Sequence, residues 1–364
     1  MRQRIRTRNG IGRNRRGAVV VLFALLIIPL LGLIAFVVDY GYLVATKVNL
    51  QRAADNAALA AVRDLVPDSY GYQDAAAVRQ TLRDYVNQNL DDGFIVLDGD
   101  IVIGRYDPAT AYSNFHIVSS GIYDTVQVTV RYDEQANSPI SMFFAKVLGI
   151  DSEELAATAT AVLQKARYLP EGSDILPVAV PVDVWNDNPL GEVWSIYGDG
   201  KIEDYQGHEV PGNWGTIDVG ANSNGTSELT DQILNGLRQV DVDVLYENGT
   251  IETSEYIDSQ YEMWLNGDTG ISSGMKSSII ESHGDVKLIP LFDVHNSDVG
   301  GNLSYHVVAW GVVRVVDSRW NGNHKSYLEI QKSFLYDGDL RPVDSLADQI
   351  DVIENAFTSP VLVR

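Results

Sequence analysis

The residue types that most often carry catalysis are sparse and poorly spaced in this chain. Gly270, Ser272 and Gly274 match the G-x-S-x-G string of serine hydrolases, but a nucleophile elbow needs a buried strand before the serine. The preceding stretch 264–270 is instead polar and rich in turn residues. With 31 glycines in 364 residues the string is unspecific, and the cap of a helix starting near Met275 explains it better. A hydrolase using Ser272 is therefore only the second alternative function.

Metal and nucleotide chemistry have little support in the sequence. The chain has no cysteine, and its six histidines show neither H-x-x-x-H nor H-E-x-x-H spacing. His306 lies in an apolar run and is predicted to be a hydrogen-bonded core residue. A G-x-x-x-x-G-K-[ST] phosphate loop is absent, which argues against an ATPase. We expect no enzymatic activity, no cofactor and no metal; the alternative is calcium at oxygen ligands that lack the order of an EF-hand, namely Asp183, Asn186, Asp187 and Asn188.

Charge is distributed unevenly along the chain. The formal net charge is −22, and a surface of that sign repels a phosphate backbone, so we expect no nucleic-acid partner. Residues 1–17 nevertheless contain seven arginines and no acidic residue. We interpret this cluster, in particular Arg13, Arg15 and Arg16, as a membrane-topology signal.

An apolar run follows the arginines directly. Residues 18–38 contain 21 positions without a charge, and as a helix they would be roughly 31 Å long, which matches the hydrocarbon thickness of a bilayer. A cleaved signal peptide would have a shorter apolar core of about 7–15 residues. We therefore predict a single-pass transmembrane helix with a cytoplasmic N-terminus and everything after Asp39 on the other side of the membrane.

The helix is predicted to continue past the membrane to about Leu65, as one rod of roughly 70 Å, because apolar residues recur at three- or four-residue spacing. This extension is rich in alanine. A slim helix permits close approach of another helix, for which Ala54 and Ala58 are candidate contacts, and hence a homo- or hetero-oligomer. The alternative is that the alanines simply favour helix formation.

These residues resemble a known family. The segments 16–18 (RGA), 38–43 (VDYGYL) and 50–60 (LQRAADNAALA) are similar to the N-terminal segment of TadE/TadG-like proteins of the tight-adherence (Flp) pilus assembly system. Segments 124–130, 143–150 and 156–161 resemble the strand, short helix and strand that follow in TadG-like chains. Looser similarity extends to 211–215, 222–228, 290–293 and 305–310.

The resemblance implies a non-enzymatic protein of the bacterial inner membrane that works with other pilus-assembly and secretion subunits. A minor pilin or pseudopilin incorporated into a filament is the alternative. A processed prepilin usually has Glu five residues after the cleavage-site glycine, whereas this chain has Leu22 five residues after Gly17. The Asp-x-Ser-x-Ser string of von Willebrand A domains, which some large TadG-like proteins carry, does not occur.

The predicted fold class is α+β, with a long helix laid on a small antiparallel sheet, as in pilins, followed by a mainly β domain of barrel or sandwich type. Predicted helices and strands in the first part are 73–89 (helix), 101–105, 125–132, 139–148 (short helix) and 156–164. Predicted strands in the second part are 175–185, 193–197, 286–291, 306–316 and 326–334, with helices at 227–239 and 274–282. The predicted divisions are a cytoplasmic segment 1–17, the span 18–38, an α+β domain 39–165 and a β domain 174–364.

Asp39 stands where the helix leaves the membrane. The nearest cation on the same chain, Lys47, is two turns away, so a local helix-surface ion pair cannot form. We therefore expect any partner of Asp39 to lie on another helix. The prediction is a contact of Asp39 with a second membrane subunit, with Tyr40 and Tyr42 as interfacial anchors.

Overall fold

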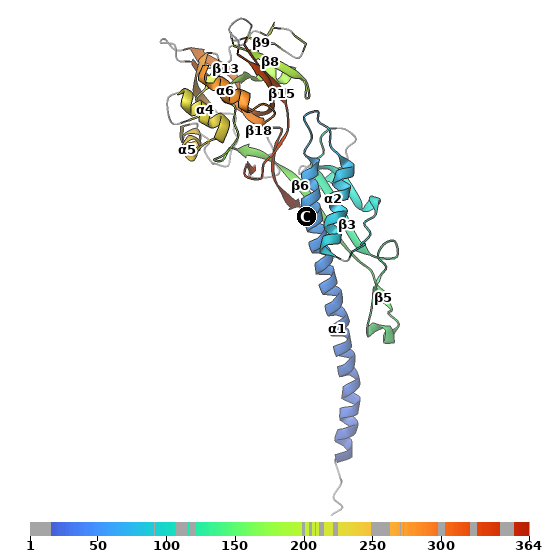
Figure 1. The fold of residues 1–364 in the computed structure, drawn as a ribbon. Helices are drawn as coiled ribbons and strands as arrows, with labels where there is room; N and C mark the ends of the chain where they lie inside the picture. Colours follow the sequence, from blue (N-terminus) through green and yellow to red (C-terminus); the bar gives the residue numbers. More distant parts are fainter. Residues whose placement is uncertain are drawn as a thin grey trace, which may run out of the picture.

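In the computed structural model, one long helix carries a small sheet, and a second, larger sheet lies beyond its C-terminal end (Figure 1). The structure describes residues 16–90, 92–106, 115–116, 121–198, 201–203, 206–207, 209–210, 215–220, 225–248, 263–269, 271, 273–297, 303–320, 326–342 and 353–363. The fold is mixed α+β, as the sequence predicts.

Helix α1 (Arg16–Ala61) is a single α-helix of 46 residues that contains Pro29. Its first half is apolar, the side chains described there are mostly exposed, and the helix is long and apolar enough to cross a membrane. One 3-10 turn, η1 (Val62–Leu65), ends the helical segment, as predicted. The chain becomes extended at Val66, because the ring of Pro67 disfavours helical geometry in the residue before it.

Helix α2 (Ala75–Asn89) lies against α1 and confirms the second predicted helix. The carboxylate of Asp74 accepts hydrogen bonds from the backbone N–H groups of Ala76 and Ala77, which satisfies two amides that the first turn would leave unpaired. Apolar side chains at spacing four, Val78, Leu82 and Val86, form the buried face.

The first sheet has seven strands in the order β16-β19-β6-β3-β1-β2, with β17 also paired to β6. Its strands are β1 (Ile101–Tyr106), β2 (Phe115–His116), β3 (Thr125–Tyr132), β6 (Leu155–Tyr168), β16 (Leu335–Tyr336), β17 (Arg341–Pro342) and β19 (Ala356–Val363). A separate two-stranded ribbon joins β4 (Ile140–Ser141) to β5 (Ser152–Glu153), and the 3-10 helix η3 (Ala145–Leu148) lies between them. The short 3-10 turn η2 (Asp98–Asp100) precedes β1.

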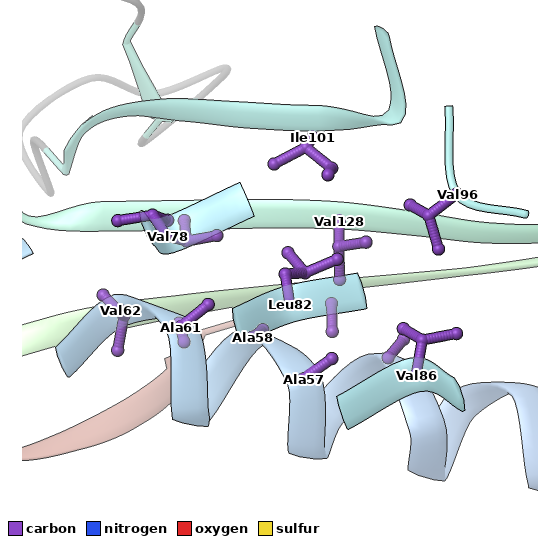
Figure 2. Close-up of a cluster of buried hydrophobic side chains, with 14 of the residues drawn as sticks. Ala57, Ala58, Ala61, Val62, Val78, Leu82, Val86, Val96, Ile101 and Val128 are labelled. Atoms are coloured by element: carbon purple, nitrogen blue, oxygen red, sulfur yellow. The ribbon is translucent and has the colours of Figure 1, made fainter. Parts of the chain in front are cut away.

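The alanine face of α1 is part of the core between α1, α2 and this sheet. Figure 2 shows Ala57, Ala58 and Ala61 on α1 with Leu82 of α2 and Val128 of β3 close by. All five side chains are fully buried. Small side chains at these positions let the backbone of α1 approach both the helix and the sheet.

The second sheet has ten strands, of which β10-β9-β8-β15-β14-β12-β11 form the main path, while β13 and β18 pair with β14, and β7 pairs with β13. Its strands are β7 (Val180–Pro181), β8 (Val193–Tyr197), β9 (Ile202–Glu203), β10 (Glu209–Val210), β11 (Gly215–Ile217), β12 (Met263–Thr269), β13 (Val286–Ser297), β14 (Leu303–Arg319), β15 (Tyr327–Lys332) and β18 (Ile353–Glu354). The helices of this part are α3 (Val182–Asp187), α4 (Thr226–Asn235), α5 (Gln239–Asn248), η4 (Ser273–Met275) and α6 (Lys276–Glu281). The mainly β second part is therefore confirmed, and β14 and β15, which lie at two of the predicted strands, pair antiparallel.

Residues 175–185 differ from the prediction of one strand. Only β7 and two isolated bridges at Ile175 and Val178 form there, and α3 begins at Val182. Pro177 and Pro181 lack the N–H donors that a continuous ladder would need. Apolar character correctly predicted burial here but not the backbone conformation.

The C-terminal strand returns to the first sheet. β19 pairs antiparallel with β6, and Phe357 lies in the same core as α1 and α2. The division into domains at 39–165 and 174–364 stays a prediction, and the structure adds that residues 356–363 lie in the sheet of the first part.

Candidate functional site

The candidate site is the point where the exposed apolar half of α1 gives way to the half that is packed on the sheet. Between Val20 and Val38 most of the side chains that the structure describes are apolar and exposed, whereas Leu50, Ala53 and Ala54 are buried. Asp39 lies at the boundary and has only 5% of its surface exposed. This boundary is where a spanning helix would leave the hydrocarbon region.

The carboxylate of Asp39 has three partners in its own chain. The backbone N–H groups of Phe143, Phe144 and Ala145 donate to it, with N···O distances of 2.9, 2.9 and 2.6 Å. These amides precede and open η3, where no helical carbonyl can accept from them. We call Asp39 with these three residues the exit junction. Three amide donors favour the ionised carboxylate, so this interaction keeps its charge paired close to the membrane.

This geometry corrects one step of the sequence argument. The sequence predicted that any partner of Asp39 lies on another helix, whereas its partners are backbone amides 104–106 residues away in the same chain. Backbone amides have no signature in a sequence, so residue types could not reveal them. Contact of Asp39 with a second subunit stays a prediction.

The other predicted site residues are placed as follows. Tyr40 and Tyr42 are exposed on α1; Tyr40 stacks on Phe36, and Tyr42 meets Phe143 edge to face at 5.3 Å. Ala54 and Ala58 are fully buried in the core of their own chain, so this face is already occupied. Arg13 and Arg15 lie outside the described residues, and Arg16 begins α1.

Polar side chains further along α1 fix the helix to the sheet. Lys47 donates to the carbonyl oxygen of Ala156, and Gln51 donates to that of Thr158 at 3.1 Å, both on β6. Together with the exit junction, these contacts hold α1 at three positions beyond the span, namely 39, 47 and 51.

A cluster of two buried carboxylates and one partly exposed arginine in the second part was not expected from the sequence. Arg238 donates from Nε and Nη2 to the two carboxylate oxygens of Asp241, at 2.8 and 2.7 Å, and also to Glu228. Burial raises the pKa of Glu228 although Arg238 opposes that shift. Burial would also raise the pKa of Asp241, but the hydrogen bonds from Arg238 outweigh it and lower the pKa. The cluster joins the start of α5 to α4.

Features that could indicate catalysis or metal binding give little support to either. Ser272 lies outside the described residues. His306 is hydrogen-bonded, as predicted, through Nδ1 to Asp293 at 2.6 Å, but it is partly exposed beside Trp264 rather than buried in the core. Within the described part of the chain, no group of three or more His, Cys, Asp or Glu side chains is placed to hold a metal ion. Of the calcium candidates, Asn188 is buried and donates to the carbonyl oxygen of Val184.

The arrangement defines a class of protein. In this class a long helix has a first half that is long enough to span a membrane and a second half that packs on a small antiparallel sheet. Family models identify this part further. Residues 17–64 match putative Flp pilus-assembly TadE/G-like domains, and residues 45–161 match putative Tad-like Flp pilus-assembly domains. Residues 17–161 are thus similar to Tad-like Flp pilus-assembly domains, as the resemblance predicted. Among curated proteins and solved structures, none matches the chain.

Proposed function

We propose that this protein is a membrane-anchored, non-enzymatic component of tight-adherence pilus assembly or pilus anchoring. The supporting observation is that the family match covers one continuous segment, residues 17–161. This segment includes the span-length half of α1, the exit junction and most of the first sheet. A family of assembly components and an exposed apolar helix together favour an anchored structural role.

The proposed orientation places the N-terminus in the cytoplasm of a bacterium and both sheets outside the inner membrane. The arginines before the span, including Arg13, Arg15 and Arg16, support it through the positive-inside rule. The proposed partners are other membrane subunits of the pilus machinery. The exposed Tyr40 and Tyr42, near the exit junction, are the candidate contacts or interfacial anchors.

A deletion strain with complementation tests the function. The wild-type gene should restore surface pili. A version in which a cleavable secretion signal replaces residues 1–38, and so releases the rest of the chain, should not. Normal piliation in the deletion strain would contradict a role in assembly, and restoration by the released form would contradict the need for an anchor.

Incorporation into a filament as a minor pilin is the second candidate function. The apolar half of α1 projects clear of both sheets (Figure 1), as a helix in a filament core would have to. Leu22, at the position where processed prepilins usually have Glu, argues against it. The mass of the mature N-terminus decides: loss of residues 1–17 would support the pilin, and retention would support the anchored component.

A further inference from the structure

The strongest feature that the proposed function leaves unexplained is an exposed apolar loop beside α1. We call residues 143–150, between β4 and β5, the apolar loop. Five of its large side chains are exposed: Val147 by 87%, Leu148 by 83%, Phe143 by 63%, Ile150 by 50% and Phe144 by 47%. Such a density of exposed apolar groups marks an interaction surface.

The loop has a defined conformation. The backbone N–H groups of Val147, Gly149 and Ile150 donate to carbonyl oxygens of the same loop, at 3.0–3.1 Å, and Met142 N–H closes its base on the carbonyl oxygen of Asp151. Gly149 adopts φ of +85°, which ends η3. The apolar side chains are therefore held outward by a closed backbone.

The exit junction fixes the depth of the loop. Its first three amides bind Asp39, the residue directly after the predicted span, and Phe143 contacts Tyr42. In Figure 1 the tip below β5 is the part of the first sheet region that lies farthest down along α1. If residues 18–38 cross the membrane, the loop lies at the level of the lipid headgroups.

Polarity along the ribbon agrees with this depth. No acidic residue occurs within 140–150, and the one cation there, Lys146, is exposed and can reach lipid phosphates while its stem lies among apolar groups. Acidic residues begin at Asp151 and continue with Glu153 and Glu154, on the side that leads back to the sheet. An apolar tip with an acidic stem is the polarity expected of an element that enters a bilayer surface from water.

We propose that the apolar loop inserts into the interface of the leaflet that α1 leaves at Asp39, as a second membrane contact with lipid as its partner. The inference rests on α1 spanning the membrane. Two contacts, one through α1 and one through the loop, would fix the tilt and rotation of the first sheet relative to the bilayer, which a single helix cannot do.

The absence of cysteine allows a direct test with single-cysteine variants of the full chain. Leu148→Cys, Leu26→Cys in the span and Leu234→Cys, exposed on α4, are each labelled with an environment-sensitive fluorophore. The proteins are reconstituted in phosphatidylcholine–phosphatidylglycerol vesicles that contain nitroxide-labelled lipids. We expect loss of fluorescence at Leu148→Cys with a shallow nitroxide, at Leu26→Cys with a deep one, and no loss at Leu234→Cys.

Each other outcome overturns the proposal in a distinguishable way. If the label at 148 is quenched by aqueous iodide but not by lipid, while the label at 26 is quenched by lipid, the loop is in water although the anchor stands. If the label at 148 is shielded from both quenchers, and the shielding disappears on dilution of protein in lipid, the loop binds protein instead. If the label at 26 escapes lipid quenching, the anchored function fails and this inference fails with it.

Discussion

Asp39 is the residue that ties the membrane-facing half of α1 to a distant part of the chain. Replacing it with Asn keeps the shape but removes the charge and one acceptor oxygen, so at least one of the three amide hydrogen bonds is lost. We expect hydrogen exchange at Phe144 and Ala145 to accelerate roughly tenfold, since bonds to a charged acceptor are the stronger ones. Native-state exchange measured by mass spectrometry checks this.

Amide exchange in the loop and recovery of a membrane partner distinguish a contact of Asp39 within the chain from a contact with a second subunit. Asp55→Asn, on the same helix, is the matched control and should leave exchange in the loop unchanged. If Asp39→Asn leaves loop exchange unchanged but reduces recovery of a membrane partner, its main contact is with a second subunit.

Arg238 compensates two buried carboxylates, so its removal should be costly. In Arg238→Met the carboxylates of Glu228 and Asp241 lose their cation, and we expect a loss of about 3 kcal/mol in unfolding free energy at neutral pH. Urea unfolding of the protein in detergent measures it. Arg52→Met, exposed on α1, is the control and should change stability by less than about 0.5 kcal/mol.

The deficit of Arg238→Met should depend on pH. In the wild type the pKa of Asp241 is lower in the folded state than in the unfolded state. The ionised carboxylate therefore stabilises the fold above the unfolded-state pKa, and this stability is lost as pH falls through the folded-state pKa. Without Arg238, burial raises the pKa of both carboxyls, and the variant gains stability as they are protonated. The deficit should therefore shrink from neutral to acid pH, and a deficit independent of pH would contradict this account.

At the scale of elements, the alanine-rich face of α1 is explained by its packing against α2 and the first sheet of the same chain. Ala58→Leu adds three carbons where α1 meets α2 and the sheet, and overpacking of this kind costs about 1–3 kcal/mol. Ala45→Leu, on an exposed position of the same helix, should be neutral. Thermal unfolding of the two variants measures the difference. A stable Ala58→Leu protein that no longer recovers a partner would instead assign this face to a contact between subunits.

At the scale of the whole molecule, the C-terminal strand couples the two ends of the chain. Phe357 of β19 lies in the core of the first sheet, close to Phe334, so Phe357→Ala should destabilise that sheet by about 3–5 kcal/mol. Protection of the amides of α2 and β6 should fall, although both lie almost 200 residues or more away in sequence. Ser359→Ala, exposed on the same strand, is the control. Unchanged protection of α2 and β6 in Phe357→Ala would contradict this account of the C-terminal strand.

Local patterns in the sequence predicted the two long helices of the first part and several strands of both parts. The uncharged run 18–38 and the spacing that follows predicted α1, and apolar spacing of four predicted α2 with its buried face. Strands β1 and β3 lie where alternating β-branched residues indicated them, and β8 and β15 lie at runs predicted to be strands. These features are set by residues close in the chain, so periodicity is sufficient to find them.

The tertiary structure alone decided which distant segments meet. Asp39 reaches the amides that precede and open η3, and β19 returns to β6, through contacts that no local spacing encodes. The same holds for Ala54 and Ala58: small residues on a helix permit close approach, but whether a sheet of the same chain or another subunit approaches depends on how the whole core is filled. Backbone donors and long-range packing carry no residue signature, so this part of the site became visible only in the folded chain.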